Sequence, residues 1–120
     1  MKKKRRPPGF TFIELMVAVL VIGLLAAIAI PQFSSYRMRA YDSAAKSTLT
    51  NLAKAQEDYY VQTQAYSANT VNLTNNSGYR GDANVNVVII NADADSWSAT
   101  AQHVSSTNVF TYTSSGGGLQ

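Results

Sequence analysis

The hydrophobic and polar positions divide the chain into an apolar first part and a mixed second part. From Leu15 to Ile30 no residue is polar, and from Phe10 onward only Thr11 and Glu14 interrupt the apolar run. As a helix, the stretch from Phe10 to Ile30 would span roughly 31 Å, about the thickness of a bilayer core. Because the run is apolar on all sides, it predicts a membrane-spanning helix and not one side of an amphipathic helix.

Beyond Pro31 the pattern changes to that of an amphipathic helix. Positions that recur at spacings of three and four form a modest stripe, which comprises Tyr41, Ala45, Leu49, Leu52, Gln56 and Tyr59. Charged residues flank this stripe, and the pattern predicts a helix that continues to about Gln64. From Tyr66 to Asp82 the periodicity is lost, and Asn and Gly residues predict turns and a connecting loop.

Three strand-like runs follow, at residues 85–90, 96–103 and 109–113. The first is rich in β-branched residues, and the other two alternate between apolar and polar positions. Their connections have lengths that suit antiparallel pairing. The predicted fold class is therefore α+β, with a long N-terminal helix packed on a small antiparallel sheet of about three strands. The glycines at 116–118 predict a loose tail.

The charges before the apolar run indicate how it is oriented. Five cations occupy positions 2–6, and no acid precedes Glu14. Such a run is typical of an export or membrane signal and predicts a cytoplasmic N-terminus. Ala27-Ile28-Ala29 fits the cleavage triplet of an ordinary secretory signal, which is the alternative interpretation. Glu14 and the length of the run argue against that alternative, because the apolar region of a signal peptide is usually only ~7–15 residues long.

The stretch Gly9-Phe10-Thr11-Phe12-Ile13-Glu14-Leu15, followed by an unbroken apolar run, resembles the prepilin signal of type IV pilins and type II secretion pseudopilins. The resemblance continues through residues 27–33 and 36–41, so it covers about the first third of the chain. The layout is most similar to the short pilins of metal-reducing bacteria, extended by a C-terminal sheet domain. The resemblance implies the pilin fold, with a leader at residues 1–9, a transmembrane and assembly helix at 10–31, and a helix continuation with a β headpiece at 32–120.

The same resemblance implies a processing step and an assembly role. A prepilin peptidase would cut between Gly9 and Phe10, and the new Phe10 amine would be methylated. Removal of the leader's five cations leaves five Lys and Arg against seven Asp and Glu, a net charge of −2. An acid in hydrocarbon costs several kcal/mol unless it is paired, so Glu14 is a functional candidate. We expect Glu14 to attract the Phe10 amine of a neighbouring subunit; snorkelling to the interface is the alternative. Gly23 and Pro31 are the expected points at which the helix kinks.

The expected function is that of a structural subunit of a type IV pilus, serving adhesion, twitching motility or extracellular electron transfer. The alternative is a pseudopilin of a type II secretion system. The expected partners are copies of the chain itself, the prepilin peptidase, the inner membrane and the pilus assembly machinery. The expected location is the inner membrane for the single-pass precursor and an extracellular filament afterwards. Because the basic charge lies in the leader, it does not indicate nucleic-acid binding.

Catalytic and metal-binding chemistry is not expected, and neither is a cofactor. The chain has no cysteine, which excludes disulfides, thiolate nucleophiles and cysteine metal sites. Its one histidine, His103, is more typical of a surface or hydrogen-bonded sheet residue than of a metal ligand. Asp93 and Asp95 are the candidate calcium ligands, but two carboxylates in a turn are also typical of a polar hairpin. The sequence therefore predicts a protein that is not an enzyme.

Aromatic residues recur along the helix and its end, at Phe33, Tyr36, Tyr41, Tyr60 and Tyr66. Their placement is similar to that in the short pilins of metal-reducing bacteria, which have been proposed to carry electrons. The alternative is that these side chains pack between subunits and against the headpiece, because aromatic residues bury a large area. We expect packing to be their main role and keep the electron path as the second hypothesis.

Overall fold

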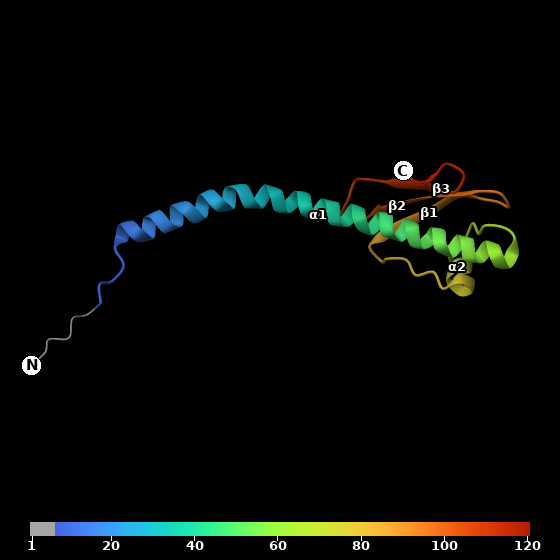
Figure 1. Ribbon diagram of the computed structural model, residues 1–120, viewed down its shortest axis with the longest axis horizontal. Helices are drawn as coiled ribbons and strands as arrows, with labels where there is room; N and C mark the ends of the chain where they lie inside the picture. The colour runs from blue at the N-terminus through green and yellow to red at the C-terminus, as the bar shows by residue number, and fades with distance from the viewer. Residues whose placement is uncertain (1–6) are drawn as a thin grey trace, which may run out of the picture. The chain divides into compact units, whose positions relative to one another are not determined.

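The computed structural model of the chain describes residues 7–120, so the cations at positions 2–6 lie outside the described residues. It contains two helices and four strands in the order α1, α2, β1, β2, β3, β4 (Figure 1). The chain divides into two compact units, one that extends to Tyr36 and one from Arg37 to Gln120. The first unit holds the start of α1, which runs from Phe12 to Thr63, and the second holds its remainder.

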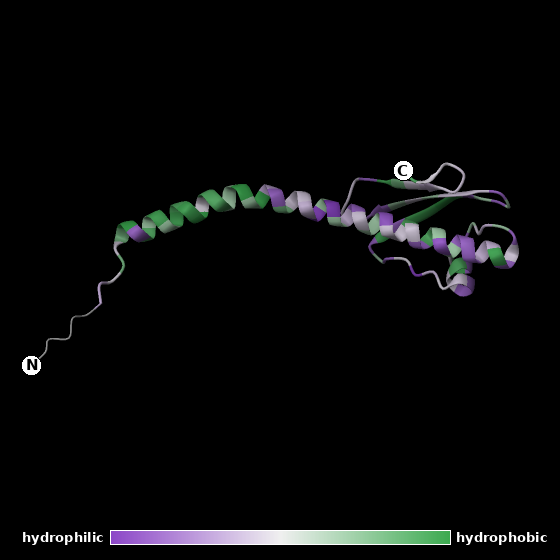
Figure 2. Ribbon diagram, viewed as in Figure 1, coloured by the Kyte–Doolittle hydropathy of each residue, from purple (hydrophilic) through white to green (hydrophobic). Residues whose placement is uncertain are grey.

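In the first unit, α1 is apolar on every side from Leu15 to Ile30. In Figure 2 the ribbon is coloured hydrophobic almost continuously there, and further along the helix hydrophobic and hydrophilic residues are mixed. The apolar stretch is long enough to cross a membrane, and none of its most hydrophobic window is buried within the chain. The helix continues through Pro31 without a break. This unit therefore depends on an apolar environment outside itself, either lipid or other protein, to cover its side chains.

The second unit packs the remainder of α1 against an antiparallel sheet. The strands are β1 (Val85–Ala92), β2 (Trp97–His103), β3 (Phe110–Thr113) and β4 (Gly118–Leu119), and they pair in sequence order. Most residues of its core come from α1 and β2. The whole core comprises Ala45, Leu49, Leu52, Ala53, Ala55, Leu73, Tyr79, Val85, Trp97, Ala99 and Ala101. The α+β prediction and the three expected strands are confirmed.

The predicted stripe on the amphipathic helix faces this core. Ala45, Leu49, Leu52 and Gln56 are completely buried, and the helix ends one residue before the predicted Gln64. Gln56 is polar, but its side chain makes two hydrogen bonds with the backbone of Ser67: its Nε2 donates to the Ser67 carbonyl at 2.7 Å, and its Oε1 accepts from the Ser67 N–H at 2.9 Å. Because both ends of the amide are paired, burial of this side chain leaves no polar atom unsatisfied.

The loop predicted between Tyr66 and Asp82 is wrong in part, because it contains the helix α2 (Thr70–Ser77). Asn69 caps its start by accepting a hydrogen bond from the Val71 N–H at 2.8 Å, and Gly78 ends it in the left-handed conformation. Leu73 anchors the helix in the core with no exposed surface. Asn residues have weak helix propensity, so the local sequence predicted turns, and the tertiary contact of Leu73 prevails.

The tail predicted to be loose is also wrong, because residues 118–119 form β4. The register places Gly118 opposite Thr113 and Leu119 opposite Tyr112. The backbones of Gln120 and Thr111 exchange two hydrogen bonds, of 2.8 and 3.2 Å. Gly117 and Gly118 both have positive φ, of 90° and 97°, which glycine adopts without strain and which lets the chain turn back on β3.

A candidate assembly site at the start of the apolar helix

The segment before α1 presents the predicted cleavage position on an exposed, non-helical chain. Residues 7–11 have no regular secondary structure, and the side chain of Phe10 is 94% exposed. A hollow of about 370 Å³ is lined by Pro8, Gly9, Phe10, Thr11 and Glu14. The peptide bond between Gly9 and Phe10 is therefore accessible and lies outside the helix, as a peptidase requires of its substrate.

Thr11 and Glu14 close the start of the helix with reciprocal hydrogen bonds. Glu14 Oε2 accepts from the Thr11 N–H at 2.8 Å and from the Thr11 hydroxyl at 2.9 Å. The Glu14 N–H in turn donates to Thr11 Oγ1 at 3.3 Å. This arrangement is a capping box, in which the residue before the helix and the third helical residue satisfy each other's backbone donors. The role of Thr11 was not predicted, although the Thr-x-x-Glu spacing before an apolar run is the signal for it.

Glu14 also borders the exposed apolar surface of the helix. A second hollow, of about 330 Å³, is lined by Ile13, Glu14, Val17 and Ala18. The carboxylate thus lies between the exposed segment that holds Phe10 and the first apolar turn. A carboxylate near a helix N-terminus is favoured by the partial positive charge of that terminus. This placement is suitable for a group that receives a cation from outside the chain.

The two expected kink positions, Gly23 and Pro31, lie inside α1. A side chain at Gly23 would meet no atom of the chain within 4 Å. Pro31 has no N–H to donate, so it leaves the carbonyl one turn before it without its usual helical partner. The kink itself stays a prediction.

The five aromatic residues of the proposed electron path are not brought together as one set. Tyr60 stacks on Tyr66, with ring centroids 4.8 Å apart, whereas Tyr41 stacks on His103 at 4.4 Å. Phe33 and Tyr36 are 65% and 64% exposed.

The stacked pair of Tyr60 and Tyr66 continues through two residues that were not predicted to belong to it. The Tyr66 ring lies 6.4 Å from Trp97, and Trp97 stacks on Tyr112 at 4.8 Å. Both added residues come from strands that pair with each other, β2 and β3, so helical spacing gave no signal for them.

The remaining candidates for chemistry have structural roles. His103 is buried on β2, stacks on Tyr41, and its Nδ1 accepts from the Ser105 N–H at 3.0 Å. Asp93 turns the β1–β2 hairpin, because its Oδ1 accepts from the N–H groups of Asp95 and Ser96 at 2.9 and 2.8 Å. Within residues 7–120, no group of three or more His, Cys, Asp or Glu side chains is placed to hold a metal ion.

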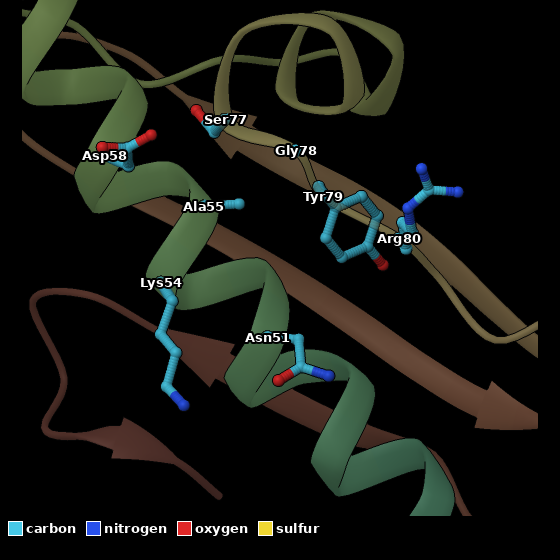
Figure 3. A pocket seen from close by; sticks show the side chains of 8 residues that line it. All are labelled: Asn51, Lys54, Ala55, Asp58, Ser77, Gly78, Tyr79 and Arg80. Carbon is cyan, nitrogen blue, oxygen red and sulfur yellow. The ribbon is translucent and has the colours of Figure 1, made fainter.

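A third hollow, of about 450 Å³, lies between α1 and the segment from Ser77 to Arg80 (Figure 3). It is lined by Asn51, Lys54, Ala55, Asp58, Ser77, Gly78, Tyr79 and Arg80. In Figure 3 the side chains of Lys54 and Arg80 point in opposite directions, away from a common centre. The two cations therefore do not converge on one anion, and the hollow does not have the geometry of an anion-binding site.

Comparison with known proteins gives two family matches. Residues 4–30 match the prokaryotic N-terminal methylation motif. Residues 31–113 match the family described as type IV minor pilin ComP, DNA uptake sequence receptor. The second match covers most of the headpiece, so the resemblance extends well beyond the apolar segment.

Individual relatives agree with these matches. The type IV wide pilus major component PilA4 of Thermus thermophilus is 34% identical over 109 residues, which cover 91% of this chain and 83% of that protein. The type IV major pilin protein PilA of Myxococcus xanthus is 43% identical over 84 residues, 65% of this chain and 38% of that protein. The type II secretion system core protein G of Pseudomonas aeruginosa is 38% identical over 64 residues, 53% of this chain and 45% of that protein. The chain thus spans most of the first relative but less than half of the other two.

Proposed function

The chain belongs to the type IV pilin family and is a structural subunit of a pilus, and we propose how its copies are held in place. In this proposal the Glu14 carboxylate pairs with the Phe10 amine of a neighbouring copy and so sets the position of each subunit in the filament. The observation that carries this proposal is the position of the Glu14 carboxylate, at the first turn of α1 and directly before a stretch, residues 15–30, that has no polar side chain. In hydrocarbon a carboxylate and an ammonium group attract each other strongly, because water does not screen them. One such pair per subunit fixes the axial register of packed helices.

The proposal includes the processing that creates the amine. A prepilin peptidase cuts between Gly9 and Phe10, and the Phe10 amine is then methylated. The cut removes the leader's cations and leaves the apolar helix attached, so the product stays anchored in the inner membrane. The assembly machinery then transfers it into an extracellular filament of identical copies, where the apolar helices bury one another. Adhesion or twitching motility is the proposed use of that filament.

The type II secretion alternative is less favoured. The related core protein G aligns over 64 residues, whereas the pilus component of Thermus thermophilus aligns over 109. A role in DNA reception, which the description of the matched family carries, is not supported by the charges of the headpiece. Residues 37–120 hold five Lys and Arg against six Asp and Glu. DNA binding depends on a cationic surface, because phosphate contacts supply most of the affinity.

Electron transfer is a second candidate function, and the stacked set of Tyr60, Tyr66, Trp97 and Tyr112 is the observation that favours it. Tyr66 and Tyr112 also pack against the core that contains Trp97, so packing accounts for their burial without any redox role. A measurement of filament conductance therefore distinguishes electron transfer from packing.

Replacing Glu14 by Gln tests the proposed function. The change removes the charge and keeps the size of the side chain. A hydrogen bond to a charged group contributes ~1.5–3 kcal/mol, so we expect at least about a tenfold loss of sheared surface filaments. The measurement is the filament yield per amount of membrane-bound subunit, with mass spectrometry to verify that the mature chain begins at a methylated Phe10.

Glu57→Gln is the matched control, because it makes the same chemical change on the same helix at an exposed position of the headpiece. It should leave the yield unchanged. Normal filaments from the Glu14→Gln chain would rule out the pairing.

A further inference from the structure

We propose that Thr11 is a positioning residue for assembly, which holds the Glu14 carboxylate in place to receive the amine of the neighbouring subunit. The inference rests on the proposed function of Glu14 and adds a second residue to it. The evidence is the pair of hydrogen bonds that the Thr11 N–H and hydroxyl both donate to the same oxygen, Glu14 Oε2, at 2.8 and 2.9 Å.

These bonds leave the other carboxylate oxygen for an incoming cation. A carboxylate carries about four acceptor sites, shared between its two oxygens. Within residues 7–120, Oε2 accepts two hydrogen bonds and Oε1 accepts none. Oε1 is therefore the oxygen that the amine of a neighbouring copy would engage.

Thr11 also restricts the conformations of the Glu14 side chain. A free glutamate has several rotamers, and holding it in one of them for a partner costs entropy when the complex forms. The hydroxyl of Thr11 donates to the carboxylate and accepts from the Glu14 N–H at 3.3 Å, so it links both ends of the residue. The cost of ordering Glu14 is then met when the helix forms and not when two subunits meet.

The same hydrogen bonds also satisfy backbone donors at the start of the helix, where the surroundings are apolar. The first N–H groups of a helix have no partner within the helix, and in a membrane no water replaces that partner. The capping box satisfies the N–H groups of Thr11 and Glu14. Glu14 thus has two tasks, to cap its own helix and to receive a cation, and Thr11 takes part in the first while preparing the second.

Substitutions can separate these two tasks. Gln also serves at the third position of a capping box, so Glu14→Gln keeps the cap and removes the charge. Thr11→Val keeps the charge and the shape of the threonine but removes the hydroxyl. Thr11→Ser keeps the hydroxyl and removes only a methyl group.

The experiment measures surface filaments per amount of trimmed, membrane-bound subunit for each variant. Losing a capping side chain changes an equilibrium by about fivefold, so we expect about fivefold fewer filaments with Thr11→Val and a yield within about twofold of the original with Thr11→Ser. Equal yields from Thr11→Val and Thr11→Ser would overturn the inference. A loss with Glu14→Gln combined with a normal yield from Thr11→Val would refute the role of Thr11 alone, whereas normal assembly of Glu14→Gln would refute the pairing.

A measurement on the unsubstituted precursor does not depend on whether a variant accumulates. In detergent micelles the Thr11 amide should exchange its proton with solvent more slowly than the Phe10 amide, because only the Thr11 amide donates to the carboxylate. Equal exchange rates at the two amides would show that the Thr11–Glu14 bond is not maintained, and the inference would then be abandoned.

Discussion

At the scale of single residues, polar side chains determine how the headpiece connections are held. Asp42 on α1 accepts hydrogen bonds from the Ser106 hydroxyl at 2.6 Å and from Asn108 Nδ2 at 2.8 Å, which ties the β2–β3 connection to the helix. Asp93 organises the β1–β2 hairpin in a similar way. Neither role was predicted, because the partners of a short polar side chain depend on which loops the fold brings near it.

Asp93 gives a pH-dependent prediction. Hydrogen bonds from the backbones of Ser96 and Asp95, and from the Asn91 side chain, lower the pKa of Asp93 below its usual value of about 3.9. The folded state therefore holds the ionised form more strongly than the unfolded state does. The resulting stability is present above the unfolded pKa and is lost as the pH falls through the folded pKa.

We expect Asp93→Asn to reduce this loss. The thermal unfolding midpoint of the original chain should fall as the pH drops below about 4, and that of the Asn variant should fall less. Circular dichroism at a series of pH values measures both. Asp95→Asn serves as the control, since Asp95 is exposed and its side chain makes no hydrogen bond within the described residues. If Asp93→Asn and Asp95→Asn gave the same curve, the role of the hairpin carboxylate would be disproved.

At the scale of elements, hydrophobic periodicity predicted where the core lies. The stripe on α1 and the alternation of β2 both face inward, with Leu49, Leu52 and Trp97 among the largest buried side chains. The hydrophobic period alone was sufficient to predict the buried side of these elements, because they are long and have one apolar side. It failed for α2 and β4, which are held by one buried leucine and by two positive-φ glycines respectively. These elements, of eight and two residues, are too short to show a clear hydrophobic period.

Leu52→Ala tests the importance of this stripe. Leu52 has no exposed surface, so the change leaves a cavity and removes apolar contacts, which should lower the free energy of unfolding of the headpiece by about 2–5 kcal/mol. Denaturant titration followed by circular dichroism measures the effect. Val61→Ala is the control on the same helix: its side chain is 74% exposed, so we expect a change within about 0.5 kcal/mol. Equal effects at the two positions would be inconsistent with the packing described.

At the scale of the whole molecule, the sequence was most informative about the start of the chain. The order of cations, glycine, glutamate and apolar run predicted the family, and the matches over residues 4–30 and 31–113 confirm it. The sequence also located Glu14, but the bonds that Thr11 makes to it became visible only with the helix start in place. The use of the filament is a property of many copies together, and no single residue pattern predicts it.

Electron transfer is a property at this scale, and it can be tested on purified filaments free of haem proteins. If electrons pass along the stacked aromatic rings, Tyr66→Leu should lower the conductance, because Tyr66 links Tyr60 to Trp97. Tyr59→Leu is the control, since Tyr59 is half-buried nearby and makes no ring stack within the described residues. An unchanged conductance in the Tyr66→Leu filaments would leave packing as the role of these residues.

The burial of Trp97 has a practical consequence. It is the chain's one tryptophan, it is 1% exposed, and its ring lies against Tyr112. Its fluorescence emission should therefore shift to longer wavelength when the headpiece opens and water reaches the indole. The molecule carries its own optical reporter, so unfolding of the headpiece can be followed in intact filaments without attaching a dye.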